Sequence, residues 1–330
     1  MHPLTRFFNY LKRVNFALAL AREHIGEREL TDWYTDWMYE LMETDEVRNR
    51  PYREAIEEAV AGKVVLELGT GRKALWALCC ARAGAKRVYA IEANERAYRA
   101  SVEFVGSQGV DNLHLIHGFS DSVELPERCE VLVHDLVGDI GSSEGMIPFI
   151  EDAKRRLLTP DAIHIPRRCT THVVLVEDPR LSLAEWAVSY AMREFRPLDA
   201  LTFVRFFGFP HSAALSKPAV FEDFVFSEAP QLRISKRLTI EVARDGELRG
   251  ACFFIRLYLS DTQVVDTWTG HTTWSTPYVR LKEGIPVRKG HVVELDVRSD
   301  LSGNPSYSVK LAHRVDGLAR DIGEYAWSGD

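Results

Sequence analysis

The chain has 330 residues, of which 46% are hydrophobic and 27% are charged, and its formal net charge is -7 at pH 7. This composition is typical of a globular protein with room for two hydrophobic cores, and the negative balance argues against a general nucleic-acid binder, which needs a basic face. The five cysteines are odd in number and include no C-x-x-C pair, so we expect no disulfide framework, no metal site and a cytoplasmic location. No apolar run approaches the roughly 18 residues that a membrane span needs, so we expect no membrane partner.

Residues 1–60 are predicted to form a helical segment. The apolar run 14–21 follows basic residues, as in a secretory signal. Apolar residues recur there at helical spacing, however, so we interpret the stretch as an amphipathic helix. Residues 40–48 are rich in helix formers, and Pro51 is expected to interrupt the helix.

Residues 61–166 are predicted to form a Rossmann-like domain. Short apolar strands alternate here with helical stretches; we expect strands at 64–68, 87–91, 113–117 and 131–134 and helices at 74–83 and 95–107. Such alternation predicts parallel βαβ units in a doubly wound sheet. The fold class is therefore α/β in this half, after the N-terminal helices.

Residues 167–330 have a different pattern, with a boundary near Ile165-Pro166. Strands follow one another without helices; we expect them at 170–176, 220–227, 238–243, 250–259, 278–281, 291–297 and 307–311. This pattern predicts an antiparallel β-barrel or sandwich. The amphipathic stretch 183–195 is the one helix expected in this half.

The first predicted strand runs into a glycine turn. Gly69 and Gly71 let the backbone approach a ligand closely at the carboxyl end of that strand. The pattern Gly69-x-Gly71-x-x-Ala74 also fits a dinucleotide fingerprint, which would indicate an oxidoreductase. Glu67 favours S-adenosylmethionine (SAM) instead, because a carboxylate there would repel a pyrophosphate and attract the ammonium of a methionine group.

Two further acids follow the next predicted strands. Glu92 ends the second strand, and its two oxygens can accept both hydroxyls of a ribose, which suits SAM and NAD equally. Asp121 follows the third strand, where SAM enzymes place an acceptor for the adenine amino group, although Ser120-Asp121 is also ordinary turn chemistry. We therefore predict that Glu92 and Asp121 bind the cofactor.

The fourth predicted strand is followed by an acidic loop. Residues 135–148 carry three acids and no base. Asp135 and Glu144 can face one another across a hairpin-like loop and hold a guanidinium, which is planar, rich in donors and always charged. Carboxylates bonded to two nitrogens would draw charge toward them and orient the third nitrogen for methyl transfer. Asp135 and Glu144 are thus the predicted catalytic pair.

These motifs together resemble the protein arginine methyltransferases. Residues 40–48 are similar to the family's N-terminal helix signature, residues 65–71 to its first SAM motif, and residues 83–92 to its second strand. The resemblance implies that Arg48 holds the SAM carboxylate and that Met42 lies beside the methyl group. It also implies a C-terminal β-barrel and a homodimer, with the helix at 183–195 in the place of the family's dimerisation arm.

The residues predicted to contact the substrate also resemble those of the family. The acidic loop matches the spacing of the family's double-glutamate loop, and Glu144-Gly145-Met146 with Pro148 looks most like the monomethylating branch. Thr272-Thr273-Trp274 lies where the family places its Thr-His-Trp loop against the substrate. The resemblance therefore implies that Trp274, Thr273 and Met146 contact the substrate.

The chain also departs from the family pattern. Asp135 is one methylene shorter than the family's glutamate, Thr273 replaces a histidine, and Arg72-Lys73 intrude where a third glycine is expected. A position that often holds a SAM-contacting histidine is Tyr39. We assign His134 to the polar contacts that these changes remove; a strand-end histidine bonded to backbone is the alternative.

The sequence thus predicts a SAM-dependent N-methyltransferase that transfers one methyl to a guanidino nitrogen of arginine and releases S-adenosyl-L-homocysteine. Free L-arginine in a biosynthetic pathway is the favoured substrate, because no accessory domain for protein substrates is evident and because Asp135 and Thr273 indicate a specialised pocket. Peptidyl arginine is the alternative. A catalytically inactive scaffold of the same fold is a hypothesis of another class, motivated by Asp135 and Thr273.

Overall fold

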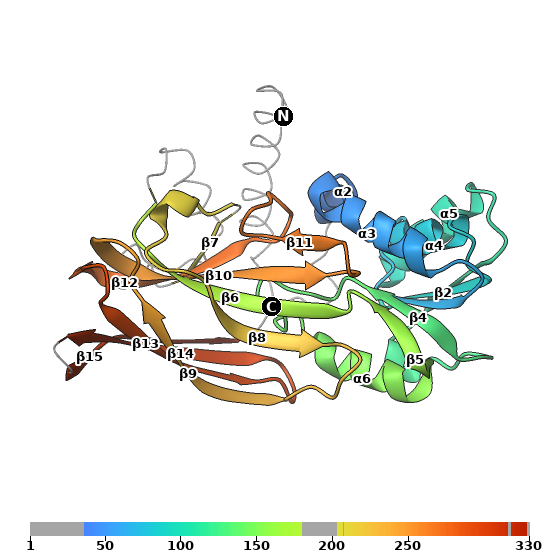
Figure 1. Cartoon of the computed structure of the whole chain (residues 1–330). Coiled ribbons are helices and arrows are strands. Elements are labelled where there is room, and N and C mark those ends of the chain that lie inside the picture. Colours follow the sequence, from blue (N-terminus) through green and yellow to red (C-terminus); the bar gives the residue numbers. More distant parts are fainter. Residues whose placement is uncertain (1–35, 180–202, 207, 316–317, 329–330) are drawn as a thin grey trace, which may run out of the picture.

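The computed structural model describes residues 36–179, 203–206, 208–315 and 318–328. A parallel sheet with helices on both sides forms one end of the molecule, and antiparallel strands form the other (Figure 1). The predicted amphipathic helix within residues 1–35 and the predicted helix at 183–195 lie outside the described residues.

The N-terminal helices are α2 (Asp36–Glu43) and α3 (Glu46–Ala59). The two helices are separate because Asp45 is the N-cap of α3. Its carboxylate accepts a hydrogen bond from the Arg48 backbone N–H at 3.2 Å. The predicted interruption at Pro51 is wrong, since Pro51 lies inside α3. Proline removes one backbone hydrogen bond there, and the buried face that includes Pro51, Tyr52 and Ile56 keeps the helix in place.

The parallel sheet has the strand order β3-β2-β1-β4-β5. Its strands are β1 (Val64–Leu68), β2 (Arg87–Glu92), β3 (Leu113–His117), β4 (Cys129–His134) and β5 (Leu158–Ile165). Helices α4 (Leu75–Arg82) and α5 (Glu95–Gly106) lie with α3 on one side, and α6 (Met146–Arg156) lies on the other (Figure 1). The strand order reverses between β1 and β4, so ligands are expected where these two strands end. The sequence predicted every strand here except β5.

The antiparallel half consists of two sheets. One has the order β7-β12-β10-β6-β8, with β11 paired to β10, and the other has the order β15-β14-β13-β9. The strands are β6 (Arg168–Val176), β7 (Phe203–Phe206), β8 (Ala219–Val225), β9 (Arg233–Glu241), β10 (Gly246–Tyr258), β11 (Val264–Asp266), β12 (Thr276–Val287), β13 (Val292–Asp300), β14 (Ser306–Val315) and β15 (Leu318–Ser328).

The two sheets pack face to face through aromatic side chains. The ring centroids of Phe221 and Phe253 in one sheet lie 5.7 Å apart, and Phe253 lies 6.0 Å from Trp327 of the other sheet. Tyr307 stacks on Trp327 at 5.4 Å. Two sheets packed in this way form a sandwich, which is one of the two architectures that the strand pattern predicted.

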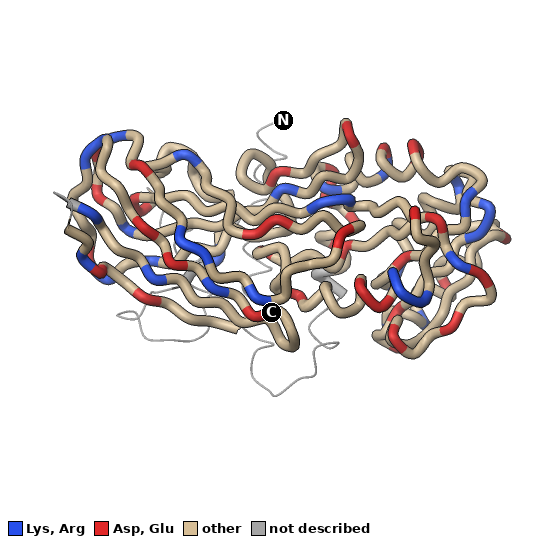
Figure 2. Tube along the Cα trace, turned by 60° about the horizontal axis from the view of Figure 1, so that its bottom comes forward, with Lys and Arg blue, Asp and Glu red and all other residues tan. Residues whose placement is uncertain are grey.

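Acidic and basic residues are interspersed along the chain (Figure 2). Strand β9 shows the pattern: Arg233 and Arg237 each pair with an aspartate of the neighbouring β13, Asp300 and Asp296. Positive and negative side chains therefore lie side by side along β9 and β13. Among the residues that the structure describes, no helix has the length and apolar character that crossing a membrane requires.

Candidate functional site

The glycine turn lies between β1 and α4 and is covered from above by α2. Gly69 and Gly71 adopt φ angles of +76° and +67°, which favour glycine. A Cβ atom on Gly71 would lie 3.1 Å from the ring of Tyr39, and one on Gly69 would lie 3.0 Å from Leu136. The turn therefore has room for backbone only, as a close ligand approach requires.

The missing third glycine of the turn has a structural replacement. Ala74 caps the start of α4 with φ of +46°, and it is the one non-glycine residue with positive φ in the described part of the chain. Arg72 and Lys73, which precede it, both pair with Glu43 of α2. The two intruding residues thus tie α2 to the glycine turn instead of blocking it.

Glu67 is fully buried beneath the glycine turn. The Thr70 hydroxyl donates to its Oε2, while Oε1 accepts no hydrogen bond from the described residues. Burial raises the pKa of Glu67 to about 8, against the opposing effect of the Thr70 hydrogen bond. A buried acceptor atom of this kind suits a cationic ligand group.

Glu92 joins the glycine turn to the end of β2. Its Oε2 accepts the Gly71 backbone N–H at 2.7 Å and its Oε1 accepts the Asn94 backbone N–H at 2.8 Å. Burial raises the pKa of this carboxyl group, and these N–H donors oppose the shift. Because a carboxylate has about four acceptor positions, Glu92 retains capacity for two hydroxyls.

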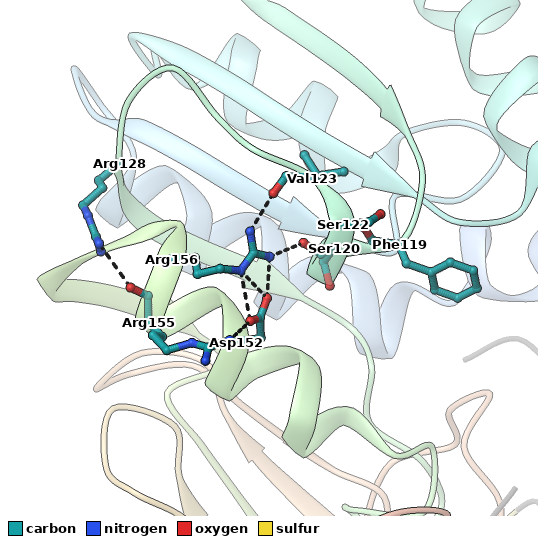
Figure 3. A network of polar contacts seen from close by, with 8 residues as sticks. All are labelled: Phe119, Ser120, Ser122, Val123, Arg128, Asp152, Arg155 and Arg156. Atoms are coloured by element: carbon teal, nitrogen blue, oxygen red, sulfur yellow. Dashed lines mark hydrogen bonds and ion pairs between the residues drawn. The ribbon is translucent and has the colours of Figure 1, made fainter.

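Asp121 is an exposed residue of the 3-10 turn Ser120–Ser122, which follows β3 and in which Ser120 is buried. Figure 3 shows Arg156, from the end of α6, reaching this turn. Its guanidinium donates to the carbonyl oxygens of Ser120 at 2.7 Å and Val123 at 2.8 Å and also pairs with Asp152. Arg156 therefore fixes the turn that presents Asp121.

Arg48 and Asp135 form a buried ion pair, with side chains 4% and 11% exposed. The Arg48 guanidinium carbon lies 5.7 Å from the ring centre of Trp76 and 5.4 Å from that of Trp274, within cation–π range. Tyr52 adds a hydrogen bond from its hydroxyl to Asp135 Oδ1 at 3.3 Å. The structure thus brings together a predicted cofactor-binding arginine and a predicted catalytic acid.

The loop of Thr272, Thr273 and Trp274 closes over the same place. The Trp274 indole N–H donates to the Val137 carbonyl at 2.6 Å, and the Thr273 backbone N–H donates to Asp45 at 2.6 Å. Asp45 therefore both caps α3 and holds this loop. Met42 lies half-buried at the end of α2, and its carbonyl oxygen accepts a hydrogen bond from the Asn49 side chain at 2.8 Å.

The acidic loop is held at its centre by its third acid. Asp139 accepts the Ser275 backbone N–H at 2.6 Å, also bonds the Ser275 hydroxyl, and lies 3.6 Å from Arg205. Glu144, at the end of the loop, is half-buried, and its Cγ would lie 3.3 Å from a Cβ atom on Gly138. The same Cβ atom would lie closer still to the Ser143 hydroxyl, so the missing side chain at Gly138 leaves room for Ser143 first and for Glu144 as well.

Two predicted substrate contacts lie in the hydrophobic core. Met146 begins α6 and is fully buried. His134 is also fully buried at the end of β4, and its ring meets Phe226 edge-on at 4.9 Å. Burial lowers the pKa of His134 to about 3, so the ring is neutral. Both assignments to the substrate stay predictions.

No family model matches the chain. It is 34% identical over 146 residues to "Probable protein arginine N-methyltransferase 6" of Arabidopsis thaliana, a match that covers 43% of this chain and 33% of that protein. "Protein arginine N-methyltransferase 1" of Schizosaccharomyces pombe is 32% identical over 152 residues, 44% of each chain. "Protein arginine N-methyltransferase 2" of Mus musculus is 29% identical over 252 residues, 74% of this chain and 54% of that one. The chain is related to the protein arginine N-methyltransferases.

The matched region spans about a third to a half of these relatives' length. Two solved structures share the fold with TM-scores of 0.74 and 16% identity. One is the "Trypanosoma brucei PRMT1 enzyme-prozyme heterotetrameric complex with AdoHcy", covering 92% of this chain and 100% of that chain. The other is Arabidopsis thaliana protein arginine methyltransferase 10 in an open conformation, covering 89% and 97%. The arginine methyltransferase fold thus extends over both halves of this chain.

Several residues that pack around the candidate site of this chain were not predicted from the sequence. Tyr52 and Trp76 stack with ring centres 4.6 Å apart beneath Arg48, and the sequence gives no motif that marks them. Asp139 was counted as an acid of the loop, but its bond to Ser275 joins positions 136 residues apart. Such partners become visible only when the sheets are assembled.

Proposed function

We propose that the chain is a SAM-dependent arginine N-methyltransferase. The observation that carries the proposal is the contact between Arg48 and Asp135. It joins the residue assigned to the SAM carboxylate to a residue assigned to the guanidinium, beside a glycine turn, in a relative of the protein arginine N-methyltransferases. A methyl donor and a guanidinium bound by these two residues would lie next to one another, as direct transfer requires.

The residues around the glycine turn fit SAM. Arg48 would hold the carboxylate of the methionine group, and the unpartnered Oε1 of Glu67 would accept its ammonium. Glu92 would take the ribose hydroxyls and Asp121 the adenine amino group, while Met42 would lie beside the methyl group. When bound, SAM supplies an electrophilic methyl group on its sulfonium.

The acidic loop fits a guanidinium substrate. Asp135 already holds one guanidinium, that of Arg48, flanked by the rings of Trp76 and Trp274. Asp135 and Glu144 would accept N–H donors from the substrate, draw positive charge toward those nitrogens, and leave the third nitrogen's lone pair facing the methyl group. Trp274 and Thr273 would border the substrate.

The comparisons favour arginine in a polypeptide over free L-arginine. The named relatives are protein arginine N-methyltransferases, whereas the preference for the free amino acid depended on two indirect signs, the lack of an evident accessory domain and the altered residues Asp135 and Thr273. We therefore propose a peptidyl arginine substrate, transfer of one methyl, and a homodimer. Free L-arginine becomes the alternative that an assay must exclude.

Radiolabelled SAM supplied with an arginine–glycine peptide, and separately with free arginine, tests the substrate. We expect label in the peptide, identified as monomethylarginine after hydrolysis. Glu144→Gln should keep SAM affinity and lower turnover on the order of 10²–10³-fold, whereas Glu151→Gln, an exposed acid on α6 paired with Lys154, should behave as the wild type. A near-normal rate in Glu144→Gln would remove Glu144 from the mechanism.

An inactive scaffold is the second candidate, because Asp135 is one methylene shorter than the family's acid and is engaged by Arg48. Calorimetry with S-adenosyl-L-homocysteine and the transfer assay together separate the two functions. Binding without transfer to any guanidine would favour the scaffold. Affinity for NAD and none for S-adenosyl-L-homocysteine would instead favour a dinucleotide enzyme.

A further inference from the structure

A second buried carboxylate lies on the sandwich side of the acidic loop. Glu222 is on β8 and is fully buried. A register shift in the β6–β8 pairing places Phe221 opposite no residue, since Thr171 pairs with Glu222 and His172 with Val220. Such a bulge re-aims the neighbouring side chain, so Phe221 and Glu222 are both buried although they are adjacent in the strand.

Glu222 collects hydrogen bonds from the acidic loop and from β6. The Ser142 hydroxyl donates to its Oε1 at 2.6 Å, and the Thr171 hydroxyl donates to its Oε2 at 2.9 Å. The Thr171 oxygen in turn accepts the Gly141 backbone N–H at 2.9 Å. The Ser142 oxygen lies 2.7 Å from the Tyr307 hydroxyl of β14.

The directions of these bonds all end at Glu222. An ionised carboxylate can only accept hydrogen bonds, so the hydroxyl groups of Ser142 and Thr171 must both donate to Glu222. Tyr307 then donates to Ser142, and the Gly141 N–H donates to Thr171. One ionised carboxylate thereby satisfies the donors of two consecutive loop residues, directly or through one hydroxyl.

The loop also packs tightly at this place. A Cβ atom on Gly141 would lie 2.7 Å from the Cys169 sulfur and 3.2 Å from the Thr171 hydroxyl. Ser142 is fully buried, and Glu144 follows it by two residues. The backbone that presents Glu144 is therefore anchored to the sandwich by this contact.

We propose that Glu222 is a positioning residue, which holds the acidic loop through Ser142 and Thr171 so that Glu144 and Asp135 face the arginine substrate together. The inference rests on the proposed methyltransferase function. Asp135 is anchored from the other side by Arg48 and Tyr52, and Asp139 is held by Ser275, so Glu222 supplies a further fixed point in the part of the loop that leads to Glu144.

Glu222 can accept both hydroxyl hydrogen bonds only while its carboxyl group is ionised. Burial raises its pKa to about 7, and hydrogen bonds from Ser142 and Thr171 oppose the shift. The titratable groups that face it are Lys236 from β9, Tyr307 from β14 and Cys169 from β6, with the exposed Asp223 next to it on β8. Protonation at lower pH turns one acceptor oxygen of Glu222 into a donor and so displaces the hydrogen bond from either Ser142 or Thr171.

The test compares kinetics and loop exchange in the wild type, in three variants of this contact and in one control variant. Thr171→Val removes the hydroxyl at nearly constant volume, Thr171→Ser restores it, and Glu222→Gln removes the charge. We expect Thr171→Val and Glu222→Gln to lower kcat/KM for the arginine peptide on the order of 10-fold or more with SAM affinity within about twofold, and Thr171→Ser to stay near the wild type. With SAM saturating, so that the ionisation of Glu67 does not enter, the rise of wild-type kcat/KM for the peptide with pH near 7 should be lost in Glu222→Gln.

Asp178→Asn is the matched control, because Asp178 accepts from Tyr278 at 2.9 Å and pairs with Arg280 away from the loop. It should lower stability and keep the pH profile. Hydrogen exchange of the amides at 135–145 should be faster in Glu222→Gln and Thr171→Val. Lost stability with unchanged kcat/KM, pH profile and exchange would overturn the proposal. If the wild type transfers no methyl group, the proposed function fails, and the exchange result alone decides the role of Glu222: faster exchange supports it and unchanged exchange overturns it.

Discussion

The ion pair between Arg48 and Asp135 allows a quantitative test of how the two halves of the site are joined. Both side chains are almost fully buried, and removing one partner of a buried pair leaves an uncompensated charge, at a cost of roughly 3–5 kcal/mol. Asparagine at position 135 retains a hydrogen-bond acceptor, and Arg48 retains its contacts with Trp76 and Trp274. We therefore expect Asp135→Asn to cost about 3 kcal/mol.

This cost converts to a melting shift through the entropy of unfolding. For 330 residues at about 2.1 cal/mol/K per residue, the total is about 0.7 kcal/mol/K, so about 3 kcal/mol lowers Tm by roughly 4 °C. The assay is differential scanning calorimetry together with urea unfolding followed by tryptophan fluorescence. The double variant Arg48→Gln/Asp135→Asn should cost less than the sum of the single variants, with a coupling of about 2 kcal/mol.

Asp296→Asn is the control, because Asp296 pairs with Arg237 at the surface, with side chains 38% and 60% exposed. Exposed pairs contribute about 0–1 kcal/mol. The reasoning is refuted if Asp135→Asn shifts Tm no more than Asp296→Asn does, or if the double variant is additive. Either result would mean that the two charges do not depend on each other.

Three further predictions concern the cofactor side. Arg156→Lys should raise the KM for SAM about 3–10-fold, since lysine cannot hold both carbonyls of the Ser120–Val123 turn. Arg155→Lys changes an exposed neighbour and should leave this KM unchanged. Equal KM values in the two variants would contradict the role of Arg156. Because Glu67 has a pKa of about 8 and must ionise to accept an ammonium, SAM affinity measured by calorimetry should rise between pH 5.5 and 7.5 by up to about tenfold per pH unit. Glu67→Gln should abolish this rise. A flat wild-type profile would reject the assignment of Glu67 to the ammonium. Ala74→Gly should change the free energy of unfolding by less than about 1 kcal/mol, whereas Ala74→Val should lower it by about 2–3 kcal/mol at a buried site with positive φ. Equal unfolding midpoints in these two variants would show that residue 74 is not left-handed.

The sequence predicted the central strands well because their patterns are local. The predicted strand 113–117 has the bounds of β3, and 64–68 has those of β1. Strand β5 was missed because the residues near its start, Thr159 to Asp161, are polar or proline and show no apolar run. Strand β15 was missed because it is an edge strand with mostly exposed or half-exposed residues, so burial leaves little pattern in it.

The site was predictable where one motif carries the residues and not where partners come from distant strands. The glycine turn, Glu92 and the acidic loop follow strand ends, and the Rossmann topology places such ends together. Glu222 was not predictable, because strict alternation puts it on the face opposite Phe221, and only the bulge opposite Thr171 buries both. Asp45 separates α2 from α3 through a local N-cap, whereas the hydrogen bond that it accepts from Thr273 is a tertiary contact that no sequence pattern marks.

The most direct test of the central claim is a single-turnover transfer experiment. Purified protein is mixed with radiolabelled SAM and an arginine–glycine peptide, and the hydrolysed peptide is analysed for methylarginine in the wild type, Glu144→Gln and Glu151→Gln. We predict monomethylarginine in the wild type and in Glu151→Gln and a loss on the order of 10²-fold or more in Glu144→Gln. Tight binding of S-adenosyl-L-homocysteine with no methylarginine in peptide or free amino acid would contradict the account.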